Sequence, residues 1–169
     1  NSATDLHTAR FIVSSGGTTD GANFTSIATA IAAATVATGK QTVFIQPGTY
    51  TENLTLSPNV NLTAYGCDSS LNGVANVTII GTCTLSTAGS VTISGIQLQT
   101  NSAAAIAVTG SAASILNLNN CHINCSNNTG ISFTTANASA AIILYNCSGN
   151  IGTTGISLFA SSSTGVLSL

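Results

Sequence analysis

Charged residues are scarce in this sequence, and none occurs after Asp68. Asp, Glu, Lys and Arg make up 4% of the chain, whereas ordinary soluble domains contain about 25%. The formal net charge is -2 and no basic stripe is present. Phosphate binding requires clustered cationic side chains, so we expect no nucleic-acid partner. Carboxylate-based catalysis is also excluded from the segment after Asp68, taken alone.

Methionine and long apolar runs are also absent. Because a translated protein starts with Met, we expect the chain to be a processed or excised part of a longer protein. A membrane span needs about 20 apolar residues in succession, and no run here approaches that length. We therefore expect no membrane span, although the mean hydropathy is +0.45. The 169 residues are about the size of one domain.

Two interleaved series of apolar–polar segments fill most of the chain with a period of about 25 residues. The first series begins at Val91, Leu116, Ile142 and Val166, and the second at Ala105, Gly130 and Gly155. Alternation with period two is typical of half-buried strands. Short strands separated by small polar turns, with no helix in the repeat, predict an all-β parallel β-helix.

The N-terminal part has a different pattern. A strand is predicted from Arg10, followed by a loop from Gly16 to Thr25 and a helix from Thr25 to Ala37. One helix face would carry Phe24, Ile27, Ile31 and Ala34. Residues 1–40 thus form an N-terminal strand and capping helix, and residues 41–169 form about four to five β-helix coils. Because the final V-L-S-L stops partway through a coil, we expect the repeat to continue past Leu169.

Three residues should mark the ends of this helix. Asn23 or Thr25 is predicted as its N-cap, and Gly39 stands where a helix stop is expected. Lys40 follows, where a cation favours the negative end of the helix dipole.

The segments F-I-V-S-S-G-G-T-T-D-G-A-N-F-T-S-I-A-T-A-I-A-A-A, T-V-F-I-Q-P-G-T-Y-T-E-N-L-T-L and N-V-N-L-T-A-Y-G resemble the opening of pectin methylesterases. These enzymes belong to the pectin-lyase-like superfamily. The resemblance covers roughly residues 11–66, and its most specific element is P-G-T-Y-T-E-N, Pro47 to Asn53. It implies a right-handed single-stranded parallel β-helix with an N-terminal capping α-helix. The same element recurs in viral and non-enzymatic members, so it indicates fold more than activity.

The catalytic set of pectin methylesterases is missing. That family places two aspartates, an arginine and a glutamine on successive coils, but no Asp or Arg follows Asp68 here. Gln97 and Gln99 are the later glutamines, and they lack an acid partner. Asp20 and Glu52 lie in the matched segment, where Glu52 is interpreted as a solvated or turn-stabilising residue. We therefore predict no catalytic, cofactor-binding or metal-binding residue.

Cys121, His122, Cys125 and Cys147 form the most site-like cluster in the sequence. Cys and His together are typical of zinc sites. The repeat favours a structural interpretation instead, because Cys121 and Cys147 align with the inward Ile96 and His122 then faces outward. Buried, reduced thiols are favoured, while a Cys121–Cys147 disulfide between neighbouring coils stays open.

Asparagines mark the same region of the repeat. Asn119, Asn120 and Asn146 are predicted at the bends of consecutive coils, because Asn tolerates left-handed backbone and stacked amides can form a ladder.

Two functional hypotheses follow. The first is a non-catalytic structural module of a virion fibre, tailspike or surface adhesin, located on a virion or outside the cell. Its expected partners are a cell-surface polysaccharide and two further copies in a homotrimer. The second is a fragment of a carbohydrate-active enzyme, pectin methylesterase-like or a polysaccharide lyase, whose catalytic residues lie outside this chain.

Overall fold

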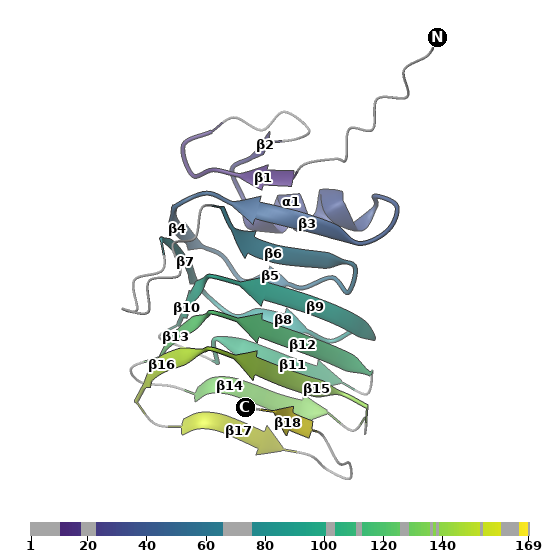
Figure 1. The fold of residues 1–169 in the computed structure, drawn as a ribbon, viewed down its shortest axis with the longest axis vertical. Coiled ribbons are helices and arrows are strands. Elements are labelled where there is room, and N and C mark those ends of the chain that lie inside the picture. Colours follow the sequence, from purple (N-terminus) through teal and green to yellow (C-terminus); the bar gives the residue numbers. More distant parts are fainter. Residues whose placement is uncertain are drawn as a thin grey trace.

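In the residues that the structure describes, the protein is mostly β-structure, with three parallel sheets and one short helix (Figure 1). The structure is a computed structural model. It describes residues 11–17, 23–65, 76–100, 104–110, 113–125, 129–135, 137, 139–152, 154–159 and 166–168.

Each sheet collects strands that are distant in the sequence. In spatial order, sheet 1 contains β18 (Val166–Ser168), β15 (Ala141–Tyr145), β12 (Ser114–Asn119), β9 (Gly89–Ser94), β6 (Val60–Ala64), β3 (Gln41–Ile45), β1 (Phe11–Val13) and β2 (Asn23–Phe24). Sheet 2 contains β16 (Ser148–Ile151), β13 (His122–Cys125), β10 (Gln97–Gln99), β7 (Val77–Ile80) and β4 (Gly48–Thr51). Sheet 3 contains β17 (Thr154–Phe159), β14 (Thr129–Thr135), β11 (Ile106–Gly110), β8 (Cys83–Leu85) and β5 (Leu54–Thr55).

From β3 onward, consecutive strands enter the three sheets in turn, and each strand pairs with the strand three places away along the chain. At the N-terminal end, β1 pairs with both β2 and β3 in sheet 1. From β3 to β17 the described strands form successive triplets, one strand per sheet, which we call repeats. Figure 1 shows these repeats stacked from the purple N-terminal end to the yellow C-terminal end. The predicted parallel repeat is therefore present, with all recorded pairs parallel in the described chain.

The register confirms most of the predicted alignment. Leu116 pairs with Val91 on one side and Ile142 on the other, all of them buried. Ile131 likewise pairs with Ile106, and both are buried. Successive residues of a strand face opposite sides, so one apolar column fills the interior at each such position. The predicted alignment of Val166 with Ile142 is wrong by one residue, because Val166 pairs with Ala141 and Leu167 pairs with Ile142.

A left-handed residue separates sheet 1 from sheet 2 in three successive repeats. Gly95, Asn120 and Asn146 have φ of 70°, 52° and 50°. The Asn146 Nδ2 donates a hydrogen bond to the Asn120 Oδ1 at 2.7 Å. The predicted amide ladder is thus confirmed for Asn120 and Asn146. Asn119 was placed at the bend wrongly, since it lies within β12 and pairs with Tyr145.

The helix α1 spans Ile27–Thr35 and is shorter than predicted. It contacts β1 and β3 near the N-terminal end of the stack (Figure 1). Its inward face buries Ile27, Ile31 and Ala34 as predicted, and also Ala30. Phe24 is buried with them and stacks against Phe11 with 6.1 Å between ring centroids.

The predicted helix ends need correction. Ser26 is the N-cap, and its side chain accepts a hydrogen bond from the Thr29 backbone N. Asn23 instead lies in β2, inside the predicted loop. Lys40 does not act on the end of the helix, which has no basic residue in its last turn; the Lys40 Nζ donates to the Ser90 carbonyl at 3.4 Å.

The described residues contain no helix that could span a membrane. The helix α1 has 9 residues, and no helix of the described chain combines the length and hydrophobicity of a transmembrane span.

Candidate functional site

Glu52 is the one acidic residue within the described ranges, and its carboxylate is hydrogen-bonded to the N-terminus of α1. Its carboxylate accepts hydrogen bonds from the Ser26 Oγ at 2.7 Å and from the backbone N of Ile27 and Ala28, both at 3.0 Å. A helix N-terminus has unpaired N–H groups and a partial positive charge, so a carboxylate there stabilises the helix. All of these contacts bridge 24 to 26 residues of sequence. Glu52 therefore has a more specific structural role than turn stabilisation.

The rest of the P-G-T-Y-T-E-N element also connects distant segments. The Tyr50 hydroxyl donates to the Gln46 carbonyl at 2.9 Å, and it lies 3.4 Å from the Val13 carbonyl. The Asn53 Oδ1 accepts a hydrogen bond from the Thr82 backbone N of the next repeat at 3.0 Å. These contacts account for the motif through the fold alone.

Replacing Glu52 by glutamine should lower the free energy of unfolding by about 1–2 kcal/mol, because a neutral amide has one acceptor oxygen and no charge for the helix dipole. Urea unfolding followed by circular dichroism measures the loss. Lys40→Gln is the matched control, since it also removes one charge but breaks only an exposed contact at 3.4 Å. Equal stability of the two variants would contradict the capping role.

The outer surface of sheet 2 carries an uncharged polar array, which we call the amide face. It consists of Gln97, Gln99, His122, Asn124, Ser148 and Asn150. These residues form two columns along the stack. His122 pairs with Gln97 on one side and with Ser148 on the other, and Asn124 likewise pairs with Gln99 and Asn150. The array presents hydrogen-bond donors and acceptors at regular spacing.

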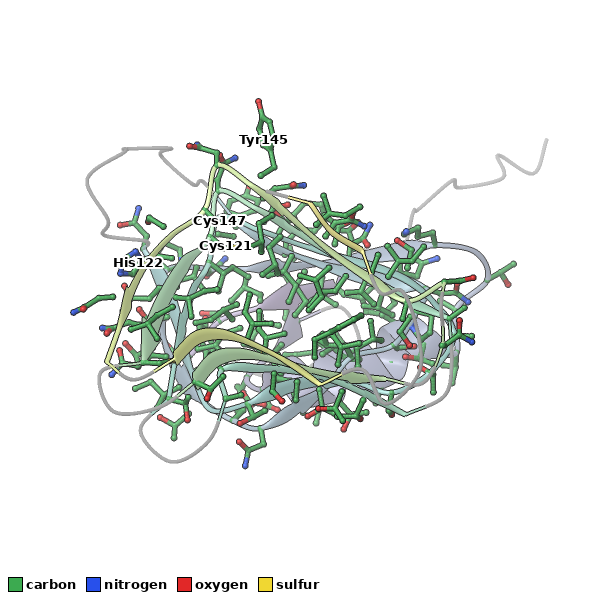
Figure 2. All side chains as sticks on the ribbon, turned by 90° about the horizontal axis from the view of Figure 1, so that it is seen from below. Cys121, His122, Tyr145 and Cys147 are labelled. Atoms are coloured by element: carbon green, nitrogen blue, oxygen red, sulfur yellow. The ribbon has the colours of Figure 1, made fainter. Side chains whose placement is uncertain are left out.

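Two contacts order this face. One ring nitrogen of His122, Nδ1, lies 2.9 Å from the Ser148 Oγ, and the Gln97 Nε2 donates to the Gln99 Oε1 at 3.3 Å. Tyr145, at the end of β15, is 69% exposed. Figure 2 shows its ring pointing away from the molecule at the corner between sheets 1 and 2, with His122 on the adjoining side formed by sheet 2. Exposed aromatic rings with a polar tip are suited to ligand contacts.

The cysteines separate into buried thiols and a stacked pair. Cys83 and Cys125 are fully buried, and burial raises the pKa of both, that of Cys83 to about 12. Cys121 is also buried, whereas Cys147 is half-buried in the next repeat. Figure 2 shows Cys121 and Cys147 together at the corner between sheets 1 and 2.

The zinc interpretation of this cluster is not supported by the orientations of its side chains. Cys121 points inward while His122 lies on the outer surface, as the repeat predicted. Cys125 is buried further along β13. Within the described ranges, no three His, Cys, Asp or Glu side chains are grouped to hold a metal ion. The structure likewise describes no buried side-chain N or O without a hydrogen-bond partner.

The other charged positions named in the sequence, Asp5, Arg10, Asp20 and Asp68, lie outside the described residues. Comparison with known proteins adds no assignment: no protein-family model, curated protein or solved structure matches this chain.

Sequence reasoning missed Tyr145 and the helix-capping role of Glu52. Alternation from the buried Ile142 places both Ile143 and Tyr145 on the outer surface of the strand. It therefore does not distinguish Tyr145 as a candidate binding residue. The amide face follows directly from alternation in β10 and β13, so the signal for it was present.

Proposed function

We propose that this chain is a non-catalytic structural module of a virion fibre, tailspike or surface adhesin. In this proposal the three sheets form a right-handed single-stranded parallel β-helix of the pectin-lyase-like superfamily, with α1 as its N-terminal cap. The regular passage of the chain from sheet 1 to sheet 3 supports the fold. Stacked repeats give a stiff, extended body suited to a location on a virion or cell surface.

The observation that carries the non-catalytic assignment is the position of Glu52. Both of its carboxylate oxygens are committed to the N-terminus of α1. A general acid or base must lie about 2.6–3.2 Å from the substrate atom with which it exchanges a proton. The carboxylate oxygens of Glu52 are instead hydrogen-bonded to Ser26, Ile27 and Ala28. No other Asp, Glu, Lys or Arg follows it except Asp68.

Glycan binding is proposed for the amide face. Its glutamine and asparagine side chains can each donate and accept hydrogen bonds, which matches the hydroxyl groups of a neutral sugar chain. The two columns run along the stack, so an extended polysaccharide could contact successive repeats. Tyr145 would pack against the apolar side of a sugar ring. The expected partner is therefore a cell-surface polysaccharide, and the assembly is proposed to be a homotrimer.

An enzyme fragment is the second candidate. Its support is the N-terminal resemblance over roughly residues 11–66. It requires acidic and basic residues supplied from outside this chain.

An array of purified capsular and O-antigen polysaccharides, probed with the full chain, tests the proposal. We expect Gln99→Ala and Tyr145→Ala to weaken binding to the best polysaccharide about tenfold each, equivalent to about 1.4 kcal/mol. Thr84→Ala, which alters an outward position of sheet 3, is the matched control and should bind normally. Light scattering on the same samples measures whether three copies associate.

Two results would count against this function. Equal loss of binding in the Thr84 variant would place the glycan elsewhere. Release of methanol or unsaturated sugars from pectin by the purified chain would favour the enzyme hypothesis.

A further inference from the structure

Cys121 and Cys147 occupy equivalent positions in adjacent repeats. The Ser148 backbone N donates to the Cys121 carbonyl at 3.0 Å, and the Asn120 backbone N donates to the Tyr145 carbonyl at 2.9 Å. These two bonds flank the cysteines and hold their backbones side by side. Adjacent strands lie about 4.8 Å apart, and disulfides form between Cα atoms about 4.4–6.8 Å apart. The spacing of the two backbones therefore falls within the range of Cα separations found in disulfides.

The two thiols are oriented alike. The Cys121 Sγ lies 3.4 Å from the Ile93 carbonyl oxygen of the preceding repeat, and the Cys147 Sγ lies 3.3 Å from the Leu118 carbonyl oxygen. Each thiol also lies near the carbonyl two residues before it, Asn119 and Tyr145 respectively. The side chains are thus related by a shift of one repeat, with both sulfurs at the same corner of the molecule (Figure 2).

Their environments differ in a way that assigns roles. Cys121 is 2% exposed, whereas Cys147 is half-buried and accessible from solvent. A hydrogen bond from the Cys121 thiol lowers the pKa of Cys147 to about 6, against the opposing effect of burial. The same contact and its own burial raise the pKa of Cys121. Thiolate is the reactive form of cysteine, so Cys147 is the attacking sulfur.

We propose that Cys147 and Cys121 form a reactive thiol pair that small-molecule disulfides oxidise to a bond joining adjacent repeats. The reagent class is an aliphatic disulfide such as glutathione disulfide. This inference does not depend on glycan binding or on the source of the chain. The pair is distinct from Cys83 and Cys125, which burial keeps as inert thiols.

The reaction has two exchange steps. The Cys147 thiolate attacks one sulfur of glutathione disulfide, whose S–S bond breaks and releases one glutathione thiolate. The mixed disulfide on Cys147 is then attacked by Cys121, which gives up its proton to solvent. The second glutathione leaves as a thiolate. The protein loses two electrons and two protons, and glutathione disulfide is reduced to two thiols.

Mass spectrometry of the folded chain after incubation with glutathione disulfide tests the pair. Because no Lys or Arg follows Lys40, peptic digestion is needed to separate the cysteine peptides. We expect a Cys121–Cys147 peptide, formed at least about tenfold faster than any adduct on Cys83 or Cys125. A Cys67→Ser background removes the one cysteine outside the described residues.

Two serine variants separate the roles. Cys121→Ser should stop at a stable glutathione adduct on Cys147, because the second thiol is missing. Cys147→Ser should form neither the adduct nor the disulfide, since Cys121 is buried. Circular dichroism shows whether each variant is folded. If a variant does not fold, the rates of adduct and disulfide formation in the parent chain still test the proposal.

The proposal is overturned if Cys121 is modified first, or if Cys147 reacts no faster than Cys83. It is also overturned if the adduct on Cys147 persists in the parent chain without forming the Cys121–Cys147 bond.

Discussion

Replacing Gly81 by alanine should cost about 3–5 kcal/mol of folding free energy, a large part of the total for one domain. A Cβ on Gly81 would overlap the Glu52 carbonyl oxygen, with the Glu52 carbonyl carbon at 2.8 Å and the Asn53 Oδ1 at 2.9 Å. The φ of Gly81 is 150°, which other residues rarely adopt. Because the obstacle is backbone, two repeats must separate to relieve it. That movement would also displace the residue that caps α1.

Gly39→Ala is the control for the backbone conformation alone. Gly39 also has a positive φ, 79°, but nothing lies within 4 Å of an added Cβ. Its replacement should cost about 1–2 kcal/mol. Urea unfolding of both variants, followed by circular dichroism, measures the difference. If the Gly81 variant is no less stable than the Gly39 variant, the two repeats can separate enough to fit the added Cβ at little cost in free energy, and the expected effect is wrong.

The stacking of repeats could be predicted from the sequence because it depends on a local rule. Alternation decides which side chains of a strand face inward, and the period of about 25 residues decides which strands align. Both rules place Leu116 against Val91, and the structure agrees. The left-handed bend was also predictable, because Asn120 and Asn146 occupy the position of Gly95.

The last register could not be fixed in this way. Ala141, Ile142, Ile143 and Leu144 are four apolar residues in a row, so alternation does not distinguish one register from the next. Pairing Ile142 with Leu167 spaces the two repeats by 25 residues, as in the β14–β17 pair. A one-residue shift reverses the faces of a strand, which makes the period the stronger guide.

The candidate site shows a similar division. The outward position of His122 and the inward position of Cys121 follow from alternation. The contact of Glu52 with Ser26 does not, because it joins residues 26 apart through a helix whose packing the sequence does not specify. The lowered pKa of Cys147 also depends on a neighbour in the preceding repeat. Properties set by pairs of distant side chains required the structure.

Leu116→Ala is the second substitution for which a large effect is expected. Leu116 is 0% exposed and lies in the middle of its column, between Val91 and Ile142. Removing its side chain leaves a cavity that neighbouring backbone cannot fill, because hydrogen bonds fix the spacing of the strands. Buried Leu→Ala changes cost about 2–5 kcal/mol. We expect a loss of about 3 kcal/mol or more here, since repeat proteins are held mainly by contacts between neighbours and two such contacts weaken together.

Ile115→Ala provides a control on the same strand. Ile115 is a side chain of equal size on the outer surface, partly exposed, and pairs with Ser90 and Ala141. Its truncation leaves no enclosed cavity, so the expected cost is below about 1 kcal/mol. The difference between the two urea midpoints, at an unchanged slope, measures the interior column directly. Similar losses for both variants would mean that the inner and outer faces of sheet 1 contribute alike, and the stack would then owe its stability to backbone pairing more than to its apolar interior.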